Sequence, residues 1–245
     1  MLLQVPALVM RSVENARVAL DDGDADKAIK MMQSTDQLCA KVVAPPTIHG
    51  LAMRVISDAY MAKNDPESAK AALEKGLALC KPHDGRAGMP EFMRADLNGR
   101  MGDLHAALGE VERSMGRAKD AVRHMRKAVE RFEVLGQAEF VAATYNRIAL
   151  VLMESGKHDQ AMHDLDEAEA LVGAGNEHEA QILSSTFAFR GRCYESKGEV
   201  EKAREAVTKA LSYAMSCGND PIVAECEAFL GKTQDKSNVD QDAFL

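Results

Sequence analysis

The seven histidines are the side chains of this sequence best suited to bind a metal ion or to transfer protons. A zinc site on one helical face needs two histidines four residues apart with a glutamate between them. No pair has this pattern, and His158 and His163 are five residues apart, so their side chains would point in different directions. The histidine spacing therefore predicts no metal ligands.

The cysteines are odd in number and have no CxxC spacing, which argues against both a disulfide framework and a zinc site. We expect them to be reduced thiols in the core of an intracellular, cytoplasmic protein. They are Cys39, Cys80, Cys193, Cys217 and Cys226.

Signals for catalysis or for a bound cofactor are also missing from the sequence. Gly99 and Gly102 are not followed by the further glycine or lysine that a phosphate-binding loop requires, and there is no nucleophile elbow. The acidic run from Glu199 to Glu205 has basic neighbours at helical spacing, as expected for an exposed, salt-bridged helix face. We expect a binding protein with no catalytic residues and no cofactor, and not an enzyme.

A turn motif that recurs along the sequence predicts the helices that would position any binding residues. A glycine or asparagine is followed five residues later by an alanine, and these alanines lie 41, 52, 40 and 42 residues apart, as in a helical repeat protein. Two antiparallel helices need a tight reversal, which glycine permits, and a small side chain where their backbones approach closely. The five pairs are Gly23/Ala28, Asn64/Ala69, Gly116/Ala121, Gly156/Ala161 and Gly198/Ala203.

A bulky residue four positions after each alanine continues the inward stripe of the second helix. The sequence has Met32, Leu73, Met125, Leu165 and Val207 at these positions. We find no long alternating run of Val, Ile or Thr that would predict a strand, so the pattern favours an all-α chain.

These residues resemble the tetratricopeptide repeat (TPR) family, in which a large residue and a small residue precede the turn and alanines follow it. The fourth unit matches with Tyr145, Ile148, Ala149, Leu152, Gly156, Ala161, Leu165 and Ala168. The repeat is near 41 residues rather than about 34, which resembles the long-repeat branch with kinesin light chain, the Leu-Gly-Asn repeat adaptors and the soluble NSF attachment proteins. No tryptophan is present, and Tyr145 and Phe187 take its place.

The resemblance implies one all-α, right-handed α-solenoid over residues 1–232, with about five helix-turn-helix repeats and a C-terminal capping helix. We expect the repeats at about 5–44, 46–82, 91–135, 137–173 and 177–218, and the capping helix at 220–232. Residues 81–93 form an inserted loop, read as an ordinary insertion or alternatively as a binding loop. Residues 233–245 are expected to be a flexible tail, and its Phe244-Leu245 end a frayed terminus or alternatively a docking motif.

Met1 to Met10 lack the basic region and cleavage site of a secretory signal, and no apolar span is long enough for a membrane. Arg11 and Arg17 leave organelle import as a lesser alternative. With 30 basic and 38 acidic residues, the net charge of −8 disfavours nucleic acid and points to protein partners.

In the family, the first helix of each repeat lines the inner, concave surface. Aligning on the turns places a mixed-charge set of partner-binding candidates there: Arg17, Arg54, Asp58, Glu110, Arg113, Asn146, Arg192 and Glu195.

The known binding modes of the family are not reproduced at these positions. The Lys, Asn, Asn, Lys, Arg set that holds a C-terminal carboxylate is missing, and so is the asparagine that follows the small residue in long-repeat adaptors. Arg54, Arg113 and Arg192 are candidates for contacts with an anionic peptide. Alternatively they pair with the nearby Asp58, Glu110 and Glu195.

Two function classes remain open. The chain is expected to be an adaptor or scaffold that binds a segment of a partner protein in its concave groove. The alternative is a structural or assembly subunit of a larger cytoskeletal, proteolytic or organellar complex.

Overall fold

Helices make up the whole of the regular structure that is described. The computed structural model describes residues 5–41 and 44–242, and side chains from residue 7 to residue 232 with the same gap. Within those ranges there are eleven α-helices, one short 3-10 helix and no strand. The predicted all-α helical repeat fold is confirmed.

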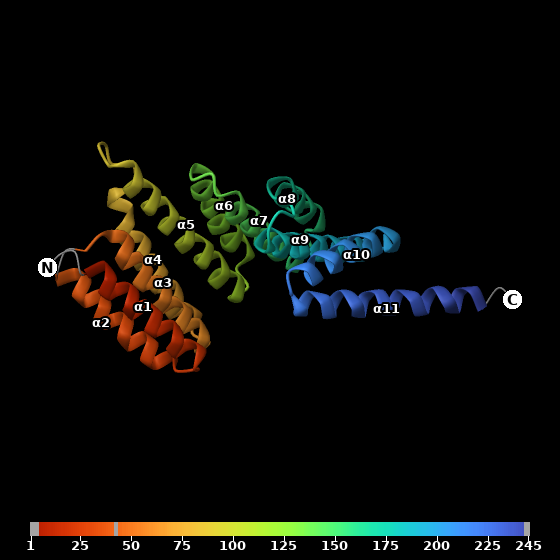
Figure 1. Cartoon of the computed structure of the whole chain (residues 1–245), viewed down its shortest axis with the longest axis horizontal. Coiled ribbons are helices and arrows are strands. Elements are labelled where there is room, and N and C mark those ends of the chain that lie inside the picture. The colour runs from red at the N-terminus through yellow and green to blue at the C-terminus, as the bar shows by residue number, and fades with distance from the viewer. Residues whose placement is uncertain (1–4, 42–43, 243–245) are drawn as a thin grey trace. The chain divides into compact units, whose positions relative to one another are not determined.

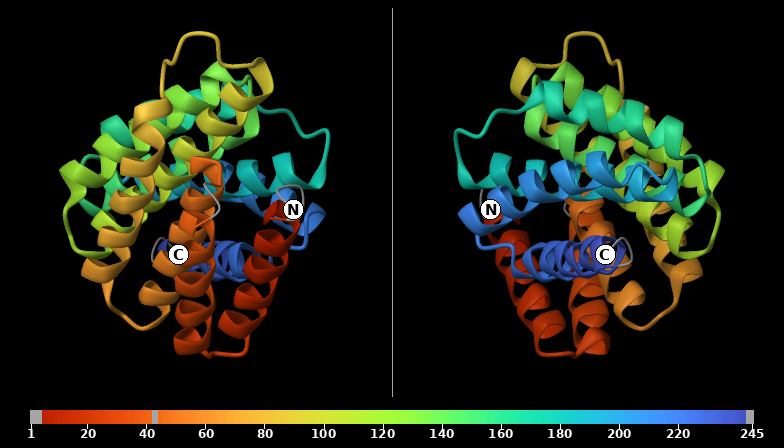
Figure 2. Two further views of the ribbon diagram at one scale, coloured as in Figure 1. Left: turned by 90° about the vertical axis from the view of Figure 1, so that its left-hand side faces the viewer. Right: turned by 90° about the vertical axis from the view of Figure 1, so that its right-hand side faces the viewer.

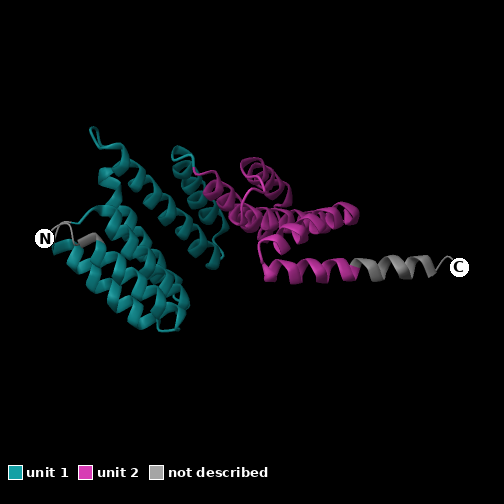
Figure 3. Cartoon of the chain, viewed as in Figure 1, with its two compact units in different colours: residues 1–136 teal, residues 137–245 magenta. Residues whose placement is uncertain are grey.

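The chain divides into two compact units, residues 1–136 and 137–245 (Figure 3). The first unit holds three pairs of helices (Figure 1). Each helix packs on the next, and the first helices of successive pairs also contact one another, as repeats of two helices require. Its helices are α1 (Val5–Asp21), α2 (Ala25–Lys41), α3 (Pro46–Ala62), α4 (Pro66–Cys80), η2 (Lys81–His83), α5 (Glu91–Ser114) and α6 (Ala118–Val134).

The second unit has two pairs of helices and a final single helix. Its first helices, α7 and α9, pack on each other, and α11 packs on both α9 and α10. The helices are α7 (Ala138–Glu154), α8 (His158–Leu171), α9 (Glu177–Ser196), α10 (Val200–Ser216) and α11 (Asp220–Asp242). One continuous array of all five pairs remains a prediction.

The turn inside each helix pair has the same geometry in all five pairs. At the third turn, Gly116 has φ +72° and donates its backbone N–H to the Arg113 carbonyl at 2.9 Å, while Arg117 donates to the Glu112 carbonyl at 2.8 Å. These two bonds are those of a Schellman motif, which needs a left-handed residue after the helix. Asn64, with φ +58°, supplies this conformation in the second pair. The turns predicted from the sequence are therefore confirmed.

Small residues allow the two helices of a pair to approach closely just beyond each turn. A β-carbon on Gly109 of α5 would lie 3.2 Å from the Ala121 carbonyl oxygen of α6, and one on Gly191 of α9 would lie 3.5 Å from the Ala203 carbonyl oxygen of α10. The alanines after the turns are fully buried. Because these alanines are fully buried where two helices lie close together, a larger side chain there would have to displace its neighbours.

Ala161→Leu and Ala203→Leu are each expected to lower the free energy of unfolding by about 1–3 kcal/mol, because both side chains are 0% exposed and a leucine would force the helices apart. The matched control is Ala170→Leu on the exposed face of α8, with an expected effect within about 0.5 kcal/mol. Urea unfolding followed by circular dichroism measures all three. Equal midpoints for the two buried variants and the control would refute the repeat register.

Two features explain the 52-residue spacing between Ala69 and Ala121, the alanines after the second and third turns. The inserted loop accounts for only part of it, because α5 has 24 residues where α7 has 17. The connection leaves η2 and projects beyond the helix ends that it joins (gold, top of Figure 2). Its base is held by Arg131 of α6, which donates to both carboxylate oxygens of Asp84 at 2.8 and 2.6 Å.

The last helix is longer than the capping helix predicted at 220–232. It continues to Asp242. That residues 233–245 form a flexible tail stays a prediction. Helix α11 begins at Asp220 and Pro221, where a proline in the first turn is compatible with a helix. Phe244 and Leu245 lie outside the described residues. In the part of the chain that is described, no helix has both the length and the apolar character needed to cross a lipid bilayer.

Candidate functional site

All eight residues predicted to contact a partner lie on the first helices of the pairs. Their exposure differs: Arg17, Arg192 and Glu195 are exposed, Asn146 is buried, and the other four are half-buried. By helix, they are Arg17 on α1, Arg54 and Asp58 on α3, Glu110 and Arg113 on α5, Asn146 on α7, and Arg192 and Glu195 on α9.

The half-buried residues of the first unit form ion pairs within their own helices. Arg54 pairs with Asp58 one turn later, and Nε of Arg113 lies 3.1 Å from a carboxylate oxygen of Glu110. The alternative in which these arginines pair with neighbouring acids is thus confirmed for α3 and α5. The side chains of Arg54 and Arg113 are 33% and 32% exposed, so both pairs are partly open to water and to competing charges.

Asn146 joins two helices of the second unit. Its side-chain nitrogen donates to the Ile182 carbonyl at 3.0 Å, and its side-chain oxygen accepts from the Thr186 hydroxyl at 2.9 Å. The residue is only 5% exposed. A buried amide with its hydrogen bonds satisfied in this way holds α7 against α9.

Arg192 has a different partner from the one expected. Its Nε and one terminal nitrogen donate to the two carboxylate oxygens of Glu225 on α11 at 2.6 and 2.5 Å, rather than to Glu195. The guanidinium also lies over the Phe189 ring at 5.4 Å. The hydrogen bonds to Glu225 raise the pKa of Arg192 further above its usual value. A bidentate pair of this kind fixes the direction of the guanidinium.

A cavity of about 340 Å³ adjoins this ion pair and is lined by Arg192 and Glu195. Ala188, Val207 and Phe229 supply apolar surface from α9, α10 and α11. The cavity therefore combines apolar walls from three helices with the charged groups of Arg192, Glu195 and Glu225. Two of the predicted residues therefore meet at a single site.

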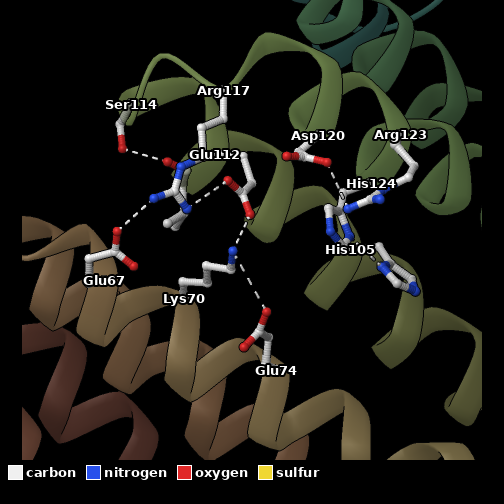
Figure 4. A network of polar contacts seen from close by, with 11 residues as sticks. Glu67, Lys70, Glu74, His105, Glu112, Ser114, Arg117, Asp120, Arg123 and His124 are labelled. Atoms are coloured by element: carbon white, nitrogen blue, oxygen red, sulfur yellow. Dashed lines mark hydrogen bonds and ion pairs between the residues drawn. The ribbon is translucent and has the colours of Figure 1, made fainter.

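Glu225 and Glu112 are the important polar residues that the sequence reasoning missed. Glu112 is 1% exposed, and its carboxylate lies 2.8 Å from Nζ of Lys70 and 3.5 Å from Arg117, which also reaches Glu67 (Figure 4). A signal existed for Glu112, because it follows Leu108 and Gly109 on the inward stripe of α5. No spacing marks Glu225, because its partner lies 33 residues away on another helix.

Among the described residues, no group of three or more His, Cys, Asp or Glu side chains is placed to hold a metal ion. Four of the five cysteines are buried, and Cys217 is half-buried. Burial raises the pKa of the Cys80 and Cys226 thiols to about 11, which disfavours the reactive thiolate. What the site residues can do is form ion pairs and hydrogen bonds.

Sequence models of known families identify the class. Tetratricopeptide repeat models match residues 100–174 and, in two further segments, residues 55–83 and 185–214. The chain belongs to the tetratricopeptide repeat family. No curated protein matches its sequence significantly.

Solved structures agree with this fold at low sequence identity. Aspartyl phosphate phosphatase F from Bacillus subtilis superposes with a TM-score of 0.75 at 16% identity, over 93% of this chain and 56% of that one. The chain thus spans a little over half the length of that protein. The nearly identical repeats of a putative kinesin light chain from Podosopora anserina give 0.64 at 16% identity, over 87% and 98%. YrrB, a TPR protein with an unusual peptide-binding site, gives 0.51 at 20% identity, over 82% and 84%.

Proposed function

We propose that this protein is a non-catalytic adaptor or scaffold that binds a segment of a partner protein on the first-helix face of its repeats. The observation that carries the proposal is the cavity lined by Arg192 and Glu195, because it combines charge with apolar surface on a helix where the family binds its partners. A peptide-binding site has been described in the structurally similar YrrB. The five free cysteines, four of them buried, are consistent with a function in the reducing interior of the cell.

The candidate contacts on this face are the exposed or half-buried charged residues. Arg192 would exchange Glu225 for a carboxylate of the partner, and Arg113 would do the same with Glu110. Arg17, Arg54 and Asp58 would supply further charged contacts on the first unit, and Glu195 would do so beside Arg192 on the second. Asn146 would act indirectly, by holding α9 in place.

A permanent subunit of a larger assembly is the second candidate, favoured by the ion pairs that already satisfy Arg54 and Arg113. A surface whose charges are paired internally can pack broadly without a dedicated peptide site. Stoichiometry separates the two functions, because a built-in subunit purifies with fixed, near-equal amounts of its neighbours through high salt.

The test is affinity purification of the tagged full-length protein from its native cell at low and high salt, with partners quantified by mass spectrometry. For an adaptor, we expect substoichiometric partners that Arg113→Glu or Arg192→Glu removes at low salt. The matched control is Lys30→Glu, an equal charge reversal at an exposed position of α2. Partners that stay with both arginine variants at fixed, near-equal amounts would instead identify a complex subunit.

A further inference from the structure

A second pocket lies in the first unit, away from the predicted partner-binding residues. Its volume is about 480 Å³, and it is lined from the end of α4 and η2, from α5 and from α6. None of the eight predicted residues is part of its lining. The pocket is formed by α4 and α6, the second helices of two successive pairs, and by α5, which connects them in the chain. The proposed function does not use it.

The lining of this pocket includes three basic and two acidic side chains, so it has a small positive excess although the chain as a whole carries a net charge of −8. Lys81 and Lys127 line it from η2 and α6, and within the described part of the chain neither has a carboxylate oxygen within 4.0 Å. Arg131 is already used, because it binds Asp84 through two nitrogens and also donates to Asn98 at 2.9 Å. Glu130 is the other acidic residue of the lining. Two ammonium groups therefore remain available to an anion.

A pair of histidines faces the same pocket. Nδ1 of His105 on α5 lies 3.3 Å from Nδ1 of His124 on α6, and the rings tilt toward each other at a centroid distance of 5.5 Å (Figure 4). His105 is 8% exposed. Two facing rings at this distance leave room for one shared proton, so at least one of them is neutral.

The surroundings of these rings create a positive electrostatic potential. Burial is the largest cause that lowers the pKa of His105, and together with His124, Lys127 and Arg131 it brings this pKa to about 4. The pKa of His124 is also lowered, first by burial and then by Arg123 and Lys127, although Glu112 and Asp120 act against this. Both imidazoles are therefore neutral at pH 7, and the net field at the pocket favours an anion.

We propose that this pocket is a second binding site, which takes the carboxylate side chains of an acidic segment of a partner protein between Lys81, Lys127 and the histidine pair. The choice of carboxylates rests on the proposed function, because the acidic side chains of a protein segment are carboxylates. The planar fork of Arg131, which could otherwise hold an anion through two parallel hydrogen bonds, is occupied by Asp84 and Asn98. Lysine ammonium groups act as point charges and suit single carboxylates.

The histidine pair couples this binding to pH. A carboxylate placed beside His105 and His124 raises their pKa values, so the complex holds more protons than the free protein. By linkage, affinity then rises as the pH falls from 7.5 to 6. The charged groups around the pair that share in this balance are Lys81, Asp84, Glu112, Asp120, Arg123, Lys127, Glu130 and Arg131.

Calorimetric titration of the full chain with a hexaglutamate peptide at about 50 mM salt tests the proposal, since screening is weak there. We expect affinity to be about threefold higher at pH 6 than at pH 7.5, with net proton uptake measured in buffers of different ionisation enthalpy. The double variant Lys81→Gln/Lys127→Gln should bind about tenfold more weakly. The matched control Lys27→Gln/Lys30→Gln on α2, with the same loss of charge, should bind as the natural chain does.

His124→Gln separates the proton coupling from the binding itself. This half-buried position should keep its affinity at pH 7.5 and lose the increase at pH 6. The proposal is overturned if the peptide does not bind, or if the two lysine double variants bind it equally. Inorganic phosphate that competes as well as the peptide at equal concentration would overturn the assignment to carboxylates.

Discussion

Leu104→Ala is expected to lower the free energy of unfolding by about 3–4 kcal/mol, the largest effect among the changes considered. Leu104 of α5 is fully buried, and its methyl groups lie against the backbones of two other helices. A β-carbon on Gly76 of α4 would be 3.2 Å from Cδ2 of Leu104, and one on Gly50 of α3 would be 3.4 Å from Cδ1. Truncation would leave a cavity between helices that cannot close in, because each is held by its own pair.

Urea unfolding followed by circular dichroism measures the loss of stability in Leu104→Ala, and Leu38→Ala on α2 is the matched control. Leu38 is 40% exposed, so the same truncation there should cost below about 1 kcal/mol. If the two variants unfold at the same urea concentration, Leu104 does not hold α5 to α3 and α4.

Lys70→Met is expected to lower the free energy of unfolding by about 2–3 kcal/mol, because it leaves the carboxylate of Glu112 buried with a single cation. The Glu112 side chain is 2% exposed and lies 2.8 Å from Nζ of Lys70. Removing one partner of a buried pair costs about 3–5 kcal/mol. The expected loss is smaller here because Arg117, at 3.5 Å, still faces the other carboxylate oxygen.

A double-mutant cycle measures this interaction by denaturant unfolding. Glu112→Gln removes the buried charge. We therefore expect this substitution to lower the free energy of unfolding less in the Lys70→Met variant than in the natural chain. Lys119→Met is the control, since Lys119 is exposed on α6 and should change stability by less than about 0.5 kcal/mol. Additive effects of the two changes would show that Lys70 does not compensate the charge of Glu112.

The roles of the charged residues follow from how the repeats meet. Glu112 connects the second helix pair to the third through Lys70 and, at the turn, through Arg117 and Glu67. Arg192 connects the last pair to α11 through Glu225. Because each repeat contacts mainly its neighbours, such polar links belong to the interfaces between successive elements. A partner that competes for one of these charges would therefore act on the repeat interface as well.

Sequence spacing predicts the ion-pair partners of two of the three candidate arginines, but not that of the third. Arg54 and Arg113 pair with acids three or four residues away on the same helix, and helical geometry predicts such pairs directly. Arg192 also has an acid three residues away, Glu195, yet it binds Glu225 of α11. The closer approach of another helix outweighs the local preference, and this cannot be predicted without the packing of α11 on α9.

By itself, the sequence determined the helix pairs, the left-handed residues at their turns and the alanines at their closest approach. These features are local: a turn such as the one at Gly116 depends on a few consecutive residues and on their backbone conformation. Only the tertiary structure decided that Asn146 is buried against α9, that His105 meets His124, and that Glu112 and Glu225 are bound by distant cations. The physical reason is that these contacts depend on how each helix is rotated about its axis and packed on its neighbours, which no short stretch of residues specifies.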